Sequence, residues 1–483
     1  MELIFLTILL LVTLFYLYYV SKPKPSIENN NAADQKLQLP PGGSGWPFVG
    51  ETMEYHKMAK RGLIDQFISD RMRKYSSKLF KTSYLGQNMV FLCSAEGNKF
   101  LFSNENKLVK PWLPGFVEKF FTNPDKKSLS QEFMSSRKAS IMFTEPMSLK
   151  NYVGIVDAAT KQHLHKYWDF KQEVKVHSLA KKFTFELACQ LMLNIQDPET
   201  TDELEKLTDC IMTEFFVLPI IIPGTKCHRA ITAMKELRQK LGAIVNQRKN
   251  EVMEKRMPEF KDILSLLVLE KDKNGEGKPE SVIVMNLIAL LLGAYDNPSI
   301  TMVSILKYLA ELPHVYEEVR REQMEIANSK GAEELLTFED TKKMKYTWNV
   351  ICEVLRLEPP NSGTFREALT DISFDGYVIP KGWKLHWAVH ASHKNPEYFK
   401  DPEKFDPSRF ERNEIVPFSY VPFGGGPRIC PGKEYARLQL LVFVHNMINK
   451  FRWEKVLPDE KLIRSPNLKP EKGFPIRLYP LEL

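Results

Sequence analysis

The chain has 483 residues, of which 26% are charged and 43% hydrophobic, a composition that suits a folded enzyme and excludes disorder over most of its length. Its net charge is +7 and no run of Lys or Arg resembles a basic arm, so we expect no nucleic-acid partner. The six cysteines have no C-x-x-C spacing, which argues against a disulfide framework or zinc knuckle and favours a reducing compartment.

The N-terminal residues 3–20 form an uncharged apolar run that, as a helix, would cover about 27 Å of bilayer. It has neither a basic region before it nor a small-residue cleavage site, so an anchor is favoured over a removed signal peptide. Lys22 and Lys24 follow the run and predict a body that faces the cytosol. We expect three parts: an anchor over 1–21, a linker and proline-rich hinge over 22–47, and one large domain over 48–483.

The large domain is predicted to be mainly α-helical with small β sheets. Helical spacing of apolar residues covers residues 55–74, 146–168, 178–195, 229–256, 259–270, 282–311, 314–329, 340–357 and 432–450. Looser alternation predicts two hairpins, one at residues 78–94 and one at residues 372–390 around Asp375 and Gly376. The helix over 282–311 is interrupted by the polar stretch "GAYDNPSI", residues 293–300.

The most informative segment is "PFGGGPRICPG", residues 422–432. Its glycines would let a flat group approach the backbone without obstruction by Cβ atoms. Cys430 precedes a predicted helix with Pro431 near its first position, so the helix dipole and Arg428 favour the thiolate. From these residues alone, the cysteine could be a nucleophile, a zinc ligand, a ligand of haem iron, or a buried residue of a glycine-rich turn.

This segment resembles the haem-ligand loop of the cytochrome P450 superfamily. The family pattern F-x-x-G-x-R-x-C-x-G is long and specific, and the chain matches it at Phe423, Gly426, Arg428, Cys430 and Gly432. The resemblance covers residues 39–483 and implies the cytochrome P450 fold and haem b. In the family the cysteine thiolate is the axial ligand of the haem iron, a role that falls here to Cys430.

Two shorter patterns stand in the family's order before this loop. The first, "EVLR", contains Glu353 and Arg356, and the second, "PSRF", contains Arg409. A lone E-x-x-R is usually a surface helix pair. In the family the three residues form a buried ion-pair cluster, which is what the resemblance implies here.

The resemblance also implies contacts to the haem from the glycine-rich loop and from arginines that pair with the propionates. The expected cofactor contacts are Phe423, Gly424 and Gly432 in the loop, and Arg137, Arg366 and Arg428 for the propionates. The match at Arg137 is loose, because Phe133 stands where many members carry tryptophan. A solvated helix face is the alternative for Arg137.

The polar stretch in the long helix is similar to the family's oxygen-groove motif, but Asn297 and Pro298 replace both hydroxyl residues. Pro298 has no N–H, so the carbonyl of Ala294 would lose its helical partner at a cost of about 3 kcal/mol. The likeness implies that Asp296 supplies protons, while Asn297 would orient a water or an oxygen and Ser299 would donate a hydroxyl if the kink turns it inward. The residues alone equally allow Asn297 as the N-cap of a second helix.

Aromatic and aliphatic stretches predict a site for a large apolar substrate. Its expected lining residues are Trp112, Phe116, Phe120, Phe215, Ala289, Ala294, Gly363 and Phe474. Ordinary core packing is the alternative for many of them. Stretches such as "IPKGWKL" (379–385) are similar to plant triterpenoid oxidases of the β-amyrin 28-oxidase type. This implies hydroxylation or stepwise oxidation of an amyrin-, lupeol- or dammarane-like triterpenoid with dioxygen.

Three alternatives stay open: a diterpenoid or sterol oxidase, a haem-thiolate isomerase or dehydratase that does not use dioxygen, and a non-catalytic lipid-binding membrane protein. The chain lacks a G-x-G-x-x-G fingerprint, so we expect electrons from NADPH through cytochrome P450 reductase. We further expect a monomer in the endoplasmic reticulum membrane, in contact with lipid. Candidate contacts to the reductase are Lys126, Lys127, Lys138, Lys433 and Arg437.

Overall fold

The computed structural model describes residues 38–46, 49–75, 77–84, 86–115, 117, 146–214, 221–254, 262–271, 274–331, 333–412, 414–464 and 467–481. The chain forms two compact units, one of residues 1–39 with 373–378 and one of residues 40–372 with 379–483. In the small unit, the N–H of Val378 donates to the carbonyl of Gln38 at 3.0 Å. The predicted anchor over 1–21 lies outside the described residues.

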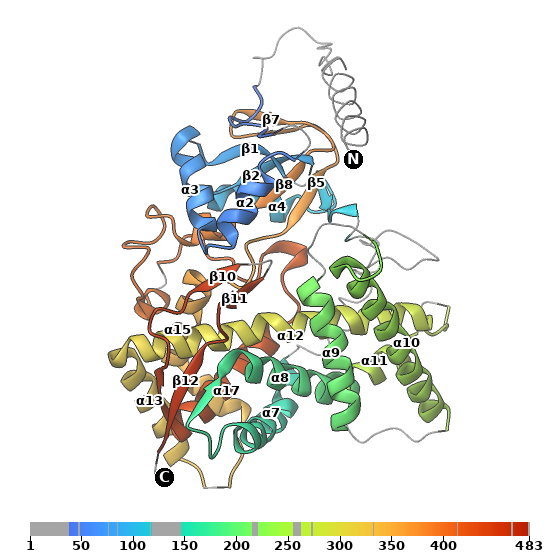
Figure 1. Ribbon diagram of the computed structural model, residues 1–483, viewed down its shortest axis with the longest axis vertical. Coiled ribbons are helices and arrows are strands. Elements are labelled where there is room, and N and C mark those ends of the chain that lie inside the picture. The colour runs from blue at the N-terminus through green and yellow to red at the C-terminus, as the bar shows by residue number, and fades with distance from the viewer. Residues whose placement is uncertain are drawn as a thin grey trace, which may run out of the picture. The chain divides into compact units, whose positions relative to one another are not determined.

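The large unit is mainly helical (Figure 1), as predicted. Its helices are α2 (Thr52–Ala59), α3 (Ile64–Tyr75), α4 (Ala95–Ser103), α7 (Pro146–Tyr167), α8 (Val176–Ala188), α9 (Pro198–Glu214), α10 (Lys226–Met253), α11 (Ile263–Leu269), α12 (Glu280–Glu311), α13 (Pro313–Asn328), α14 (Phe338–Lys343), α15 (Lys345–Leu357), α16 (Val389–His393) and α17 (Lys433–Lys450). Short π- or 3₁₀-helical turns add η1 (Cys189–Leu193), η2 (Pro407–Phe410) and η3 (Gly426–Arg428). Each predicted helical segment coincides with one or two of these helices, whereas α4, α9 and α16 were not predicted.

The strands form small sheets. The hairpin predicted at 78–94 is present, whereas the one predicted over 372–390 is confined to residues 372–379, because residues 384–387 join the largest sheet. The largest sheet has the order β1-β2-β8-β5-β3, with β1 (Leu79–Tyr84), β2 (Gln87–Leu92), β8 (Lys384–Trp387), β5 (Phe365–Ala368) and β3 (Val109–Pro111). The others are β4-β12-β9 (Glu173–Lys175, Pro475–Pro480, Phe451–Lys455), β10-β11 (Leu462–Arg464, Leu468–Pro470) and β6-β7 (Ile372–Phe374, Tyr377–Ile379). Asp375 and Gly376 both have positive φ, as a tight hairpin turn requires.

Helix α12 is the central helix of the large unit and packs against α8, α9 and α10 (Figure 1). It runs unbroken for 32 residues with Pro298 inside it. The alternative of two helices joined at Asn297 is therefore wrong. By length and composition α12 could cross a membrane, but 72% of its most apolar stretch is buried, which identifies it as a core helix.

Candidate functional site

The glycine-rich segment forms a tight loop that leads from η3 to α17. Its backbone is closed by the N–H of Cys430, which donates to the carbonyl of Phe423 at 2.9 Å. A Cβ atom on Gly425 would lie 2.5 Å from the Phe102 ring, and one on Gly426 would lie 2.4 Å from the Phe102 carbonyl oxygen. These two glycines are therefore needed for direct packing of the loop on α4, a reason that the sequence did not reveal.

Cys430 itself is exposed at the end of this loop. Helix α17 begins at Lys433 with Gly432 as its N-cap, so Pro431 lies two residues before the helix, near its first position. Within the described part of the chain, no three His, Cys, Asp or Glu side chains are grouped as a metal site requires. This leaves the zinc hypothesis without a ligand set among those residues.

The predicted ion-pair residues lie together. The guanidinium of Arg356 donates to both carboxylate oxygens of Glu353 at 2.7 and 2.8 Å, and both side chains are fully buried. Arg409 donates to the same carboxylate at 3.3 Å and to the carbonyl of Asp401 at 2.9 Å. The cluster thus joins α15 to the segment that carries η2.

His393 connects this cluster to the cysteine loop, a role that no local sequence pattern indicates. Its Nε2 accepts from the N–H of Val421 at 2.9 Å, so Nδ1 carries the hydrogen that bonds the carbonyl of Arg356 at 3.2 Å. Burial lowers the pKa of His393 to about 3. The neutral ring is therefore a fixed connection between α15 and residue 421.

Two of the three arginines expected at the propionates share one carboxylate, that of Glu105. Arg366 on β5 and Arg428 in η3 each donate through Nε to Glu105, both at 2.6 Å. The Glu105 side chain is only 2% exposed. Two guanidinium groups and one carboxylate leave a net charge of +1 in this buried cluster, so an anion would be bound favourably there. The third arginine, Arg137, lies outside the described residues.

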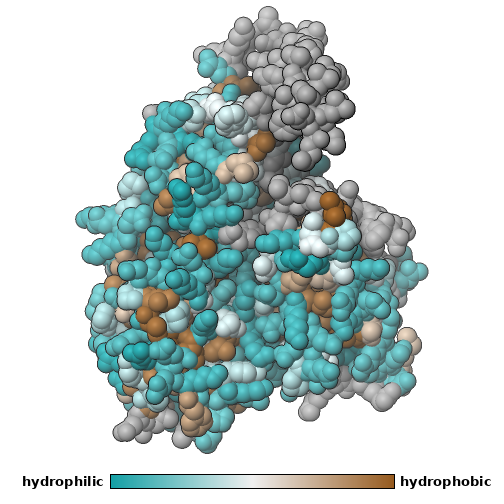
Figure 2. Space-filling model, viewed as in Figure 1, coloured by the Kyte–Doolittle hydropathy of each residue, from teal (hydrophilic) through white to brown (hydrophobic). Residues whose placement is uncertain are grey.

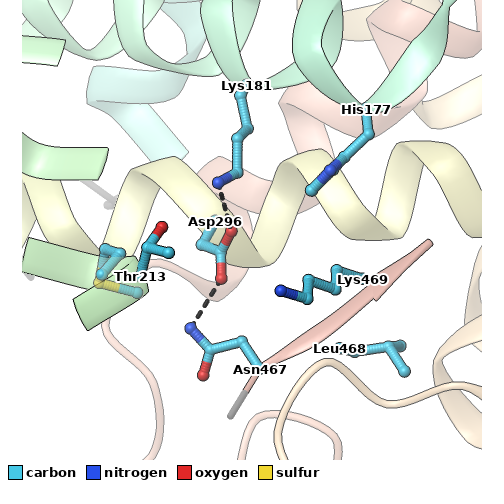
Figure 3. A pocket seen from close by; sticks show the side chains of 8 residues that line it. His177, Lys181, Thr213, Asp296, Asn467, Leu468 and Lys469 are labelled. Carbon is cyan, nitrogen blue, oxygen red and sulfur yellow. Dashed lines mark hydrogen bonds and ion pairs between the residues drawn. The ribbon is translucent and has the colours of Figure 1, made fainter. Parts of the chain in front are cut away.

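Asp296 extends from α12 into a small polar pocket (Figure 3). One carboxylate oxygen accepts from the amide of Asn467 at 2.7 Å and the other lies 3.4 Å from the ammonium of Lys181 on α8. Lys181 also donates to Asp209 at 2.8 Å. Burial alone would lower the pKa of Lys181, but the charges of Asp296 and Asp209 raise it, so the ammonium form is favoured.

The other two residues predicted in the oxygen groove have different surroundings. The side-chain carbonyl of Asn297 accepts from the amide of Asn361 at 3.2 Å. Ser299 is fully buried, and its hydroxyl donates to the carbonyl of Asp296 at 2.8 Å. As placed, Ser299 has no hydrogen left for the predicted role of a substitute hydroxyl.

The predicted lining residues divide into two groups. Trp112 is half-buried and packs edge-on against Phe365, and Ala289 and Ala294 lie on α12. Phe474 is 1% exposed and, like Ala294, belongs to the main buried core. Gly363 is required for packing too, because a Cβ atom there would lie 1.8 Å from the carbonyl oxygen of Trp387. Phe116, Phe120 and Phe215 lie outside the described residues.

These features fit a flat, anionic, iron-bearing ring. Cys430 provides a solvent-accessible sulfur, the Glu105 cluster provides excess positive charge, and α12 provides an open face. A Cβ atom on Gly293 would meet no described atom within 4 Å beyond the backbone of its own helix, so a planar group has room beside the helix. The fold and the site define a haem-thiolate enzyme.

The chain belongs to the cytochrome P450 family, whose family model it matches over residues 40–477. It is 62% identical over 482 residues to luvungin A synthase CYP716AC1 of Citrus sinensis, with 99% of this chain and 100% of that protein covered. It is 47% identical over 479 residues to β-amyrin 28-monooxygenase of Medicago truncatula, with 99% and 97% covered. Among solved structures, retinoic acid-bound cyanobacterial CYP120A1 matches with a TM-score of 0.82 and 28% identity, covering 92% of this chain and all of that one.

Membership confirms the predictions of fold, cofactor and enzyme class. The protein is a cytochrome P450 monooxygenase that uses haem with thiolate-ligated iron and takes its electrons from a reductase. The relatives' names extend the likeness to triterpenoid oxidases that the sequence indicated.

Proposed function

We propose that this monooxygenase hydroxylates or stepwise oxidises a triterpenoid, with Cys430 as the axial ligand of the haem iron. The substrate assignment is carried by identities of 46–62% over nearly the whole chain to proteins that include β-amyrin 28-monooxygenases. These matches cover 99% of this chain and so include its loops, on which substrate choice depends.

Cys430 is the exposed cysteine among the six in the chain. Cys93, Cys189, Cys227 and Cys352 are buried, and Cys210 is partly buried. Burial raises the pKa of Cys352 to about 12 and raises the pKa values of Cys93 and Cys189 as well, so these three remain thiols. Access and chemistry both favour Cys430 as the thiolate ligand.

The residues around the haem site would have separate tasks. Arg366 and Arg428 would bind the propionates, because the single carboxylate of Glu105 neutralises only one of their two positive charges. The bound haem supplies the chemistry of oxygen activation, and the protein supplies protons and excludes water. Asp209, whose side chain is 47% exposed, contacts Lys181, which contacts Asp296. Protons from solvent would reach the Asp296 carboxylate through the Lys181 ammonium along these contacts.

We place the enzyme in the endoplasmic reticulum membrane as a monomer with one N-terminal anchor over residues 1–21 and a cytosolic catalytic domain over 48–483. The face drawn in Figure 2 is mostly hydrophilic with separate hydrophobic patches. Large apolar side chains nevertheless stand exposed in two stretches of the chain: Trp46 at 81% and Met53 at 70% in one, and Ile221 at 63% and Ile222 at 60% in the other. Such side chains suit a lipid surface, which would supply an apolar substrate.

The test is expression of the full chain with a plant cytochrome P450 reductase in a host that makes several triterpene skeletons, followed by mass spectrometry of the products. An oxygenated triterpenoid that requires NADPH is the expected result. Products from added sterols or diterpenes alone would overturn the substrate assignment.

The ligand assignment is tested separately by absorbance of the reduced, carbon monoxide-bound protein. Cys430→Ser should remove the thiolate-type maximum, whereas Cys210→Ser should keep it. An unchanged spectrum in Cys430→Ser would overturn the assignment.

A further inference from the structure

We propose that Asn361 is a positioning residue, which fixes the amide of Asn297 so that its NH₂ group is left to donate toward the open face of α12. This inference rests on the proposed function, since it concerns the side of the helix where the haem would bind. Asn361 lies in the connection between α15 and β5, a segment that sequence reasoning did not assign to the oxygen groove.

The contact itself determines the direction of the amide. Nδ2 of Asn361 donates to Oδ1 of Asn297 at 3.2 Å. An asparagine side chain has one acceptor oxygen and one NH₂ group with two donors. Because the oxygen of Asn297 is turned toward Asn361, its NH₂ group is turned away from Asn361 and is the end of the amide left for other partners.

The loop that carries Asn361 is fixed on both sides. On one side, the buried Arg464 donates to the carbonyls of Pro359 and Pro360 at 2.7 and 2.5 Å. On the other side, the carbonyl of Ser362 accepts from the N–H of Val389 at 3.1 Å. Hydrogen bonds from a buried guanidinium to carbonyls are charge-assisted and strong. The side chain of Asn361 is therefore presented from a rigid backbone.

Asn297 also has a fixed backbone and shares a helix face with a residue beside open space. Its own carbonyl accepts from the hydroxyl of Thr301 at 2.8 Å, within the unbroken helix. Ala289, Gly293 and Asn297 are spaced four residues apart and so lie on one face of α12. The first two are small, and the space beside Gly293 is open. Asn297 is thus the polar side chain at the end of a small-residue strip.

A fixed donor at this position divides the chemistry of the site between two residues. A hydroxyl both donates and accepts a hydrogen bond and can pass on a proton, whereas an amide NH₂ only donates. Asn297 as held by Asn361 can bind an oxygen atom but cannot relay a proton. Proton delivery would then depend on Asp296, whose carboxylate is bound by Lys181 and Asn467.

The experiment measures the carbon–oxygen stretching band of carbon monoxide bound to the reduced full-length protein. A hydrogen-bond donor near the bound gas lowers this frequency, and a lone pair raises it. Wild-type protein should give one sharp band, and Asn297→Ala should move it to higher wavenumber. Asn361→Ala should give two bands, because the Asn297 amide can then turn both ways. Asn361→Asp should give one band above the wild-type position, because its carboxylate accepts from the Asn297 NH₂ and turns the amide oxygen outward.

Double variants separate this effect from a general change of the loop. Asn297→Ala/Asn361→Ala and Asn297→Ala/Asn361→Asp should both match Asn297→Ala alone, since Asn361 acts only through Asn297. Band positions in Asn361→Ala and Asn361→Asp that equal wild type would overturn the inference. The inference would also be overturned if the Asn361 substitutions shifted the band equally in the wild-type protein and in Asn297→Ala. A protein without a thiolate-type absorbance maximum would contradict the proposed function instead, so the two failures are distinguishable.

Discussion

The position of Glu105 leads to an unusual prediction, because its carboxylate accepts hydrogen bonds from the same two arginines that we propose for the haem propionates. Both Nε atoms lie 2.6 Å from it, and the side chains of Arg366 and Arg428 are only 7% and 16% exposed. Hydrogen bonds to charged groups contribute about 1.5–3 kcal/mol each. Glu105→Gln keeps one acceptor oxygen but turns an NH₂ group toward the second guanidinium. We expect the haem-free protein to lose about 3 kcal/mol of unfolding free energy.

With haem bound, the expected loss is smaller. The two guanidinium groups of Arg366 and Arg428 then pair with the two propionates, so the cofactor neutralises the positive charge that Glu105→Gln leaves unpaired. If the loss falls to about 1 kcal/mol, the remaining 2 kcal/mol must reappear as tighter haem binding, about 30-fold, because binding and stability are linked. Glu105 therefore competes with the propionates.

The assay has two parts. Denaturant unfolding of the wild type and of Glu105→Gln is measured with and without haem, and the rate of haem transfer from each protein to a competing acceptor protein is measured as well. The matched control is Glu96→Gln, which removes an exposed carboxylate from α4 and should change neither quantity measurably. Equal losses with and without haem, or weaker haem binding in Glu105→Gln, would refute competition. Either result would mean that Glu105 pre-organises the arginines.

Three further variants test the proton source, a buried acid and the ion-pair cluster. Asp296→Asn should lower turnover about 100-fold, the scale of a lost proton donor, and turnover near wild type in a product assay would contradict that role. Burial raises the pKa of Glu205 to about 7 from 4.5, so the stability of the wild-type protein falls as the pH rises from about 4.5 to 7. In thermal melts, Glu205→Gln should be more stable than the wild type by up to about 3 kcal/mol at pH 8 and equally stable at pH 4.5. Arg356→Lys should cost about 3–5 kcal/mol, because a lysine cannot reproduce the paired bonds to a buried carboxylate, whereas Arg412→Lys at the surface should cost little in the same denaturant titration.

The sequence predicted the features that have a local pattern. Long apolar periodicity located α12 and α17, and the cysteine loop was identified because its pattern is dense and specific. Helix α4 was missed, although Ser94 caps it by accepting from the N–H of Gly97. It has only 9 residues, and its apolar pattern is shorter than the window that separates a helix from noise.

The rest of the site depends on contacts that no local pattern can indicate. Glu105 meets Arg366 and Arg428 across 261 and 323 residues of chain, and Asn361 meets Asn297 across 64. A buried acid and an exposed amide have no periodicity of their own. Conversely, the sequence offered Phe474 as a lining residue and could not indicate that its side chain is buried in the main core.

Side-chain hydroxyl groups surround the proline inside α12. Pro298 removes a backbone donor, yet the helix continues through it. Three nearby carbonyls accept from side-chain hydroxyls at 2.8–2.9 Å, those of Tyr295, Asp296 and Asn297 from Thr184, Ser299 and Thr301. These bonds lie on the three residues that follow Ala294, whose carbonyl is the one that Pro298 leaves without its helical donor.

The same hydroxyl groups donate to backbone carbonyls of α12. They are therefore not free to donate toward the open face of α12, which carries Ala289, Gly293 and Asn297. On that face the polar group is the amide of Asn297, which a hydroxyl residue replaces in the usual family motif. An amide needs an orienting partner to present one end consistently, and a hydroxyl does not. The exchange of hydroxyl for amide at position 297 thus creates a requirement for a residue such as Asn361, held by Arg464 on a rigid loop. The two asparagines should therefore behave as one unit, so that a substitution at position 361 has no effect once the Asn297 amide has been removed.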